Sequence, residues 1–336
     1  PPAVKAVLAK FGSGKEEDKL VGYLSFLKIG PQLLKFVPGD KARDLKNWLT
    51  VYAYWNQGGK ENVEEAFAFL ASEYLQPPGQ EKKEQSFIEK IFGGGSSAPK
   101  PPVETPALGL YHPQREREKQ PYFETISSYL DWHARTQPGV VPPDAPRVAV
   151  LLYRKHVITK QPYLADLVES FEQSGVLPIP IFINGVEAHT IVRDMLTSDH
   201  EQKQRKQGII EVDSLKSDAA VVDAVVSTVG FPLVGGPAGS MEAGRQAEVA
   251  QGILGAKNIP YFVAAPLLIQ DIASWVRSGV GGLQSTILYA LPELDGAIDT
   301  VALGGLCGDN IYLTRERVFA LANRLKQWHA LRNSKR

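Results

Sequence analysis

Five short apolar runs recur along residues 147–303, and patterns typical of helices separate them. The runs are bounded by turn residues and read RVAVLLY (147–153), LPIPIFI (177–183), VVDAVVSTV (221–229), IPYFVAA (259–265) and GAIDTVAL (296–303). Helical spacing of apolar residues covers 162–175, 187–196, 240–256 and 267–279. Strands that are apolar on both faces and alternate with helices form parallel sheets covered on both sides. We therefore predict a doubly wound, mainly parallel α/β domain over residues 107–336, with a further strand near 108–113 and a closing helix capped by Thr314.

The first part of the chain has a different pattern. Apolar residues recur at intervals of three and four over residues 1–76, which predicts a helical domain with Leu49, Tyr52 and Trp55 in its core. Residues 77–106 are rich in Gly, Ser and Pro, as in GGGSSAPKPPVETP, and have few side chains to bury. This composition predicts a linker or mobile insertion between the two domains.

The charge balance and the cysteine count exclude several classes of protein. Lys+Arg and Asp+Glu number 37 each, so the chain as a whole has no electrostatic attraction for nucleic acid or an anionic membrane. The single cysteine, Cys307, excludes an intrachain disulfide and favours a reducing compartment. No apolar stretch approaches the roughly 20 residues that a membrane-spanning helix needs.

A glycine-rich stretch, GFPLVGGPAGSMEAGRQ (230–246), follows the third apolar run. It lacks the Gly-Lys-Ser/Thr of a nucleotide-binding P-loop, and Gly235, Gly236 and Gly239 give G-G-x-x-G rather than G-x-G-x-x-G. We therefore expect no ATP site here. Two interpretations stay open: the free N–H groups of a helix beginning near Ser240 bind a carboxylate or phosphate, or the loop is a tight turn with Ser240 as the N-cap.

Several long segments resemble the large (H) subunits of magnesium chelatases, which are related to the large subunits of cobaltochelatases. They are residues 1–39, LLYRKHVITKQP (151–162), PIPIFINGVEAH (178–189), the glycine-rich stretch, AAPLLIQDIASW (264–275) and GGLQSTILYALPELDGAIDT (281–300). The resemblance runs through nearly the whole chain except around Lys82–Pro101. Members of that family are several times longer, so the chain resembles an internal fragment of one.

The resemblance implies a part in chlorophyll biosynthesis, within the subunit that binds protoporphyrin IX for the insertion of Mg²⁺. It also implies that partner ATPase subunits, rather than this chain, bind and hydrolyse ATP. The expected partners are the porphyrin, the rest of the large subunit and those ATPase subunits. Metal insertion strips water from Mg²⁺ and removes two pyrrole protons, which calls for carboxylate or histidine groups and an apolar slot.

Polar residues follow several of the predicted strands. Because the carboxyl ends of parallel strands share one edge of a sheet, where ligands bind, we expect a binding site there. Basic groups at that edge suit the two propionates of a porphyrin. The candidate binding residues are Arg154, Lys155, His156, Lys160, Gln161, Asn184, Gly235, Gly236, Ser240, Arg245, Gln246 and Gln270. The alternative is a solvated loop or a contact with another domain.

Glu187 and His189 are candidate metal ligands in the loop after the second apolar run. The alternative for both is helix capping or hydrogen bonding to the backbone. No catalytic residue is assigned, and we expect no catalysis by this chain alone.

Two other functions stay open. A cobaltochelatase-type subunit would act on a corrin precursor, although the long matching segments favour the magnesium branch. A non-catalytic scaffold would use the same sheet edge to hold another domain or a partner. For location, the low-complexity insertion favours a chloroplast stroma over a cyanobacterial cytoplasm.

Overall fold

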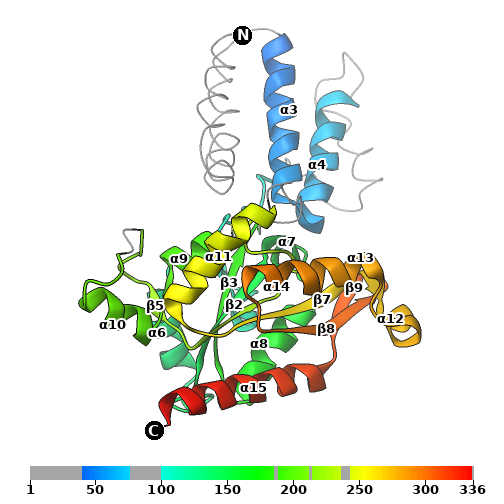
Figure 1. Ribbon diagram of the computed structural model, residues 1–336. Coiled ribbons are helices and arrows are strands. Elements are labelled where there is room, and N and C mark those ends of the chain that lie inside the picture. Colours follow the sequence, from blue (N-terminus) through cyan, green and yellow to red (C-terminus); the bar gives the residue numbers. More distant parts are fainter. Residues whose placement is uncertain (1–39, 76–99, 185–187, 212–213, 236–242, 335–336) are drawn as a thin grey trace. The chain divides into compact units, whose positions relative to one another are not determined.

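A computed structural model describes residues 40–75, 100–184, 188–211, 214–235 and 243–334, with 40–42 and 243–246 described by their backbone alone. The chain divides into two compact units, Pro1–Pro106 and Ala107–Arg336 (Figure 1). Over the described ranges, none of the helices combines the length and the apolar character that crossing a membrane requires.

The described part of the first unit contains a pair of helices, α3 (Asp40–Gln57) and α4 (Gly59–Tyr74). This agrees with the predicted helical character of the N-terminal portion. Leu49 and Tyr54 are buried, whereas Trp55 is 73% exposed. The prediction that Trp55 lies in the core is therefore wrong, because the adjacent Tyr54 occupies the buried position of that helical turn.

Side chains of the two helices hold residues 100–106. The amide of Asn62 donates to the carbonyl of Val103 (3.0 Å) and its Oδ1 accepts from the N–H of Val103 (2.8 Å). Gln57 Oε1 accepts from the N–H of Thr105 at 2.9 Å. These bonds satisfy backbone groups that would otherwise pair within a helix or a sheet.

The second unit is built on a seven-stranded sheet in the order β1-β3-β2-β6-β7-β8-β9. The five central strands are parallel, while β1 and β9 pair antiparallel at the two edges. This confirms the predicted mainly parallel, doubly wound α/β domain. The strands are β1 (Gly109–Leu110), β2 (Arg147–Tyr153), β3 (Leu177–Ile183), β6 (Ala224–Ser227), β7 (Tyr261–Asp271), β8 (Asp299–Cys307) and β9 (Asn310–Leu313), and β4 (Leu196–Thr197) pairs separately with β5 (Ala220–Val221).

Helices cover both faces of this sheet (Figure 1). One face packs against α6 (Ile126–Thr136), α9 (Ala188–Asp194) and α11 (Ala243–Lys257), and the other against α8 (Tyr163–Gln173) and α15 (Arg315–Asn333). Side chains of β2 alternate between the two cores, Leu151 entering the first and Val150 and Leu152 the second. The other helical segments are η2 (Pro113–Arg115), α7 (Arg154–Ile158), α10 (Asp199–Lys206), α12 (Ile272–Ser278), α13 (Gly282–Ser285), the π-helix η4 (Thr286–Ala290) and α14 (Leu291–Asp295).

Three sequence predictions need correction. The run at 221–229 is not one strand, because it contributes to β5 and, after a break, to β6. The predicted helix over 267–279 begins only at Ile272, since β7 stays paired with β8 as far as Asp271. That residue then caps α12 by accepting from the N–H of Ser274 (2.7 Å). Thr314 does precede α15, but its side chain makes no capping hydrogen bond.

Two prolines lie inside β3 without disturbing its pairing with β2. The N–H of Leu177 donates to the carbonyl of Pro146, so the N–H groups of alternate residues point toward β2. Pro178 and Pro180 occupy the intervening positions, where a missing N–H costs no bond to β2. Their carbonyls accept from the hydroxyl of Tyr129 (2.8 Å) and the N–H of Tyr111 (3.0 Å).

The β8–β9 hairpin requires glycine at position 304. A Cβ added to Gly304 would lie 1.9 Å from the carbonyl oxygen of Tyr312 on the paired strand. We expect Gly304→Ala to lower the free energy of unfolding by about 2 kcal/mol or more, measured by denaturant unfolding, because backbone has to move. Gly252→Ala is the control, since Gly252 lies in α11 with nothing within 4 Å of an added Cβ, and should not destabilise. Equal stability of both variants would contradict the packing described.

Candidate functional site

The strand order creates a switch point between β2 and β6. From β2 the chain moves to β3 on one side, and later returns to β6 on the other side. In doubly wound sheets ligands bind outside the carboxyl ends of the strands at such a point. Here those ends are Tyr153 on β2 and Ser227 on β6, which are followed by α7 and the glycine-rich stretch.

An aromatic group occupies this edge. The ring of Tyr153 lies edge-on to His156 (centroids 5.2 Å apart) and to Phe231 (5.8 Å), and both Tyr153 and Phe231 are half-buried. His156 is buried, and its Nδ1 shares a 2.7 Å hydrogen bond with the hydroxyl of Tyr163. Burial lowers the pKa of His156 to about 4, so its imidazole is neutral at physiological pH. These three rings therefore form an uncharged aromatic group.

The start of the glycine-rich stretch is held by both backbone groups of Leu233. Its N–H donates to Asp295 Oδ2 (2.6 Å), and its carbonyl oxygen lies 3.0 Å from the N–H of His189 and 3.2 Å from Nδ1 of that ring. Gly230 and Gly235 have φ values of 75° and 88°, which side-chain-bearing residues rarely adopt. These residues form a fixed turn at the switch point.

The predicted basic and polar residues are only partly brought together. On α7 and the turn after it, Arg154 is buried, while Lys155 and Lys160 are exposed beside His156. Asn184 follows β3 and is half-buried. The neighbouring parallel strands β3 and β2 thus place Asn184 and the start of α7 at the same edge.

Gln161 and Gln270 make structural contacts. Gln161 Oε1 accepts from the N–H of Ile311 at 2.9 Å, which links the turn after α7 to β9. Gln270 closes the loop between α12 and α13, donating to the carbonyl of Gly279 (2.8 Å) and accepting from the N–H of Gly281 (3.0 Å). Their predicted part in binding stays a prediction.

Several predicted site residues lie outside the described residues. These are Glu187, Gly236 and Ser240, together with the side chains of Arg245 and Gln246, whose backbone belongs to α11. The two interpretations of the loop around Ser240 therefore both stay open. His189 makes the backbone contacts given above, and its predicted role as a metal ligand stays a prediction.

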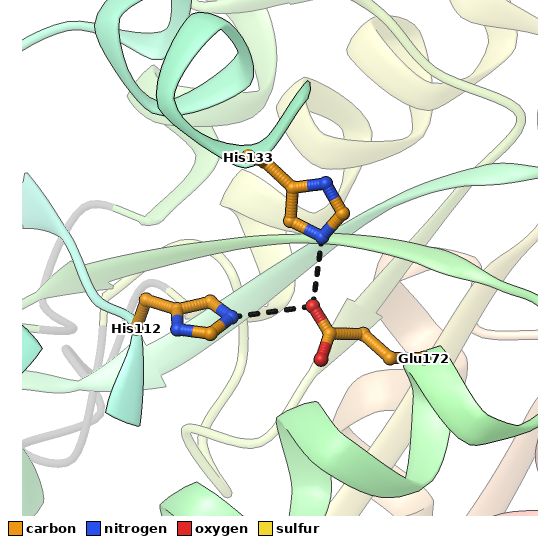
Figure 2. Close-up of side chains that lie close together, drawn as sticks. All are labelled: His112, His133 and Glu172. Atoms are coloured by element: carbon orange, nitrogen blue, oxygen red, sulfur yellow. Dashed lines mark hydrogen bonds and ion pairs between the residues drawn. The ribbon is translucent and has the colours of Figure 1, made fainter. Parts of the chain in front are cut away.

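A second polar group, in the same unit, has no counterpart in the sequence predictions. His112 follows β1, His133 lies on α6 and Glu172 on α8, and all three are at most 6% exposed. Both Nε2 atoms approach the same carboxylate oxygen, at 3.2 Å from His112 and 2.8 Å from His133 (Figure 2). Burial raises the pKa of Glu172, but hydrogen bonds and charge from the two histidines outweigh it and lower the pKa to about 2. The carboxylate is therefore ionised.

A surface hollow of about 460 Å³ lies elsewhere, between α9, α10 and α11. It is lined in part by Lys257 and Glu201, a buried ion pair with 2.9 Å between Nζ and Oε2. Lys257 also donates to the carbonyl of Leu196 at 2.6 Å. Burial lowers the pKa of Lys257 and the charge of Glu201 opposes that shift. These contacts account for the buried charges as a structural pair.

The residues that sequence reasoning missed fall into two kinds. Tyr153 and Phe231 had a local signal that was not used. Tyr153 is the last residue of an apolar run and Phe231 follows Gly230, so both come where predicted strands end. Asp295, by contrast, meets Leu233 from 62 residues away. No local pattern indicates such a contact.

The fold and this edge define a doubly wound α/β domain with an aromatic group at its switch point. Residues 52–336 match the family described as CobN/Magnesium Chelatase, and the chain belongs to that family. Residues 1–49 match a domain of unknown function (DUF3479).

Individual relatives agree with this family assignment. The magnesium-chelatase H subunit of Chlorobaculum parvum is 34% identical over 99% of this chain and 22% of its own length. That of Cereibacter sphaeroides is 29% identical over 89% of this chain and 21% of its own length. The chloroplastic ChlH subunit of Oryza sativa subsp. indica is 27% identical over 96% of this chain and 21% of its own length. The chain spans about a fifth of the length of these relatives.

The conformation of Gly230 provides a test of the fixed turn. A Cβ there would meet Leu288, Ala265 and Leu268 at ordinary contact distances of 3.6 to 3.8 Å, so backbone strain alone remains. We expect Gly230→Ala to reduce the free energy of unfolding by about 1–2 kcal/mol, because a residue with a side chain rarely adopts a φ of 75°. Gly252→Ala on α11 is the control and should not destabilise, since nothing lies within 4 Å of its added Cβ. Denaturant unfolding of both variants checks this, and equal stability of the two would contradict it.

Asp295 makes stability depend on pH. Burial raises its pKa from 3.8 to about 6, although the N–H of Leu233 opposes this. A raised acid pKa favours folding while the group is protonated, so this contribution is lost as pH rises from about 4 to 6. We expect Asp295→Asn, which keeps an acceptor without charge, to unfold like the parent at pH 4 and to be more stable at pH 7, by up to about 2 kcal/mol.

Asp295→Ala is the contrasting variant. It leaves the buried N–H of Leu233 without an acceptor, which should make it about 1–3 kcal/mol less stable than Asp295→Asn at either pH, because neither variant titrates. An Asp295→Asn variant whose stability relative to the parent is the same at pH 4 and pH 7 would show that the carboxylate charge is not penalised in the folded state.

Proposed function

We propose that this chain is part of the porphyrin-binding subunit of magnesium chelatase, the complex that inserts Mg²⁺ into protoporphyrin IX in chlorophyll biosynthesis. The observation that carries the proposal is the 34% identity to a magnesium-chelatase H subunit over 99% of the chain. In this assignment Mg²⁺ and the porphyrin are substrates of the complex, and partner ATPase subunits bind ATP. The chain by itself has no catalytic activity.

The carboxyl edge at the β2–β6 switch point is the porphyrin contact in this proposal. Tyr153 and Phe231 supply partly exposed rings that pack against an apolar macrocycle. Lys155 and Lys160 are exposed at the same edge and suit the propionates. The neutral His156 beside Tyr153 adds no charge that would oppose an apolar ring.

Two alternatives define what the test has to separate. The matching family includes CobN as well as magnesium chelatase, so a corrin precursor is the competing ring. A scaffold would use the same edge for protein and bind neither ring. The chloroplastic rice relative supports a chloroplast stroma, and the bacterial relatives support a bacterial cytoplasm, so the plastid location stays a prediction.

A fluorescence titration tests the proposal directly. The 336-residue chain is titrated with a water-soluble protoporphyrin analogue while quenching of its five Trp is recorded. We expect saturable binding with a Kd on the order of micromolar, and weaker binding of a corrin-ring competitor. No binding by a chain that circular dichroism shows to be folded would place the porphyrin site elsewhere in the parent subunit.

Charge variants then locate the site on the chain. Lys155→Gln combined with Lys160→Gln should weaken binding about fivefold or more, because two charge-assisted contacts to propionates are lost. Lys326→Gln is the matched control, since Lys326 is exposed on α15 and follows no strand of the parallel sheet. If the double variant and this control bind the porphyrin equally well, Lys155 and Lys160 are not part of the porphyrin site.

A further inference from the structure

Three ligand-type side chains converge in the interior of the second unit from three separate elements. His112 lies between β1 and η2, His133 in the last turn of α6, and Glu172 near the end of α8. Figure 2 shows both imidazole rings directed at one oxygen of Glu172. One ligand atom from each residue lies within 4.8 Å of the other two.

The spacing of these atoms is slightly shorter than that of a coordination shell. Ligand atoms placed 2.0–2.2 Å from a tetrahedral ion are about 3.3–3.6 Å from one another. The two Nε2–Oε1 distances are 3.2 Å and 2.8 Å, so a small shift of His133 and Glu172 would admit an ion between the three atoms.

The surroundings are largely aromatic. The ring of His112 lies 4.6 Å from that of Trp132 and 6.3 Å from that of Tyr129. The hydroxyl of Tyr129 is already engaged by the carbonyl of Pro178. Packed rings of this kind fix the directions of the histidines, which is the preorganisation that a metal site needs.

We propose that His112, His133 and Glu172 bind a divalent transition-metal ion, with Zn²⁺ the best match, and that the ion ties the β1–α6 segment to α8. Two imidazoles and one carboxylate are typical zinc ligands, whereas Mg²⁺ prefers oxygen ligands and keeps several waters. The site is thus distinct from the handling of the substrate Mg²⁺. It does not depend on the function proposed above, because burial of all three residues gives it a structural role.

One contact sets the cost of metal binding. The N–H of Gln114 donates to Nδ1 of His112 at 3.3 Å, which leaves the ring proton on Nε2, where it donates to Glu172. Coordination through Nε2 moves that proton to Nδ1 and gives up the Gln114 contact. The contact is longer than an ordinary hydrogen bond, so its loss costs little compared with three metal–ligand bonds.

A cobalt titration is the primary test. The untagged 336-residue chain, freed of metal with a chelator, is titrated with Co²⁺ and then with Zn²⁺. We expect one equivalent of Co²⁺ to give visible d–d absorption bands, Zn²⁺ to displace it, and Mg²⁺ to leave it unchanged. Bound Zn²⁺ should also raise the melting temperature, since the ion binds only the folded chain.

Matched variants assign the ligands. Glu172→Gln and His133→Asn should each weaken Zn²⁺ binding at least about 100-fold. Glu169→Gln, exposed on the same helix α8, and His200→Asn, on α10, should leave it unchanged. If the ligand variants do not fold, Zn X-ray absorption of the parent chain counts imidazole ligands directly, and two are expected.

Two outcomes would overturn the proposal. A folded chain with no stoichiometric Co²⁺ or Zn²⁺ binding would show that the three residues form a hydrogen-bonded cluster only. Binding that persists unchanged in folded Glu172→Gln and His133→Asn would place the metal at other residues.

Discussion

Strand β2 is hydrogen-bonded to parallel neighbours on both sides, and most of the second unit follows from that constraint. Val148, Val150, Leu151 and Leu152 are fully buried, so both faces of the strand need cover. Parallel neighbours cannot be joined by a tight turn, and each connection therefore contains a crossover with a helix. Leaving β2 in one direction and returning in the other brings Tyr153 and the turn at Gly230 to the same edge.

The central strands were predictable because their continuous apolar sequences indicate burial on both faces. β2 and β3 coincide with the apolar runs at 147–153 and 177–183, since a strand buried on both faces has no alternation to obscure its ends. The end of β7 was not predictable in the same way. Its last residues pair with β8 through an irregular register, and apolar residues such as Leu267 and Leu268 satisfy a helical pattern equally well.

The candidate site divides along a similar line. Strand topology predicted which edge carries the polar residues, because every parallel strand ends there. Side-chain contacts across long separations were not predictable: Glu172 meets His133 and His112 from 39 and 60 residues away. Gln161 and Gln270 show the converse, since their positions after strands suggested a ligand, whereas the structure gives each of them a backbone partner. The local sequence indicates at which edge of the sheet a residue lies, whereas its hydrogen-bond partner depends on how distant segments pack.

The prolines of β3 have a consequence for self-association. An outer strand edge with free N–H groups templates pairing with another chain, which leads to aggregation. Pro178 and Pro180 remove two of these donors, and the hydroxyl of Tyr129 and the N–H of Tyr111 occupy their carbonyls. The short β1 covers Ile181 and Phe182 beyond them. A strand as short as β1 is therefore enough to cover β3, because the rest of this edge has few free hydrogen-bonding groups for an incoming strand.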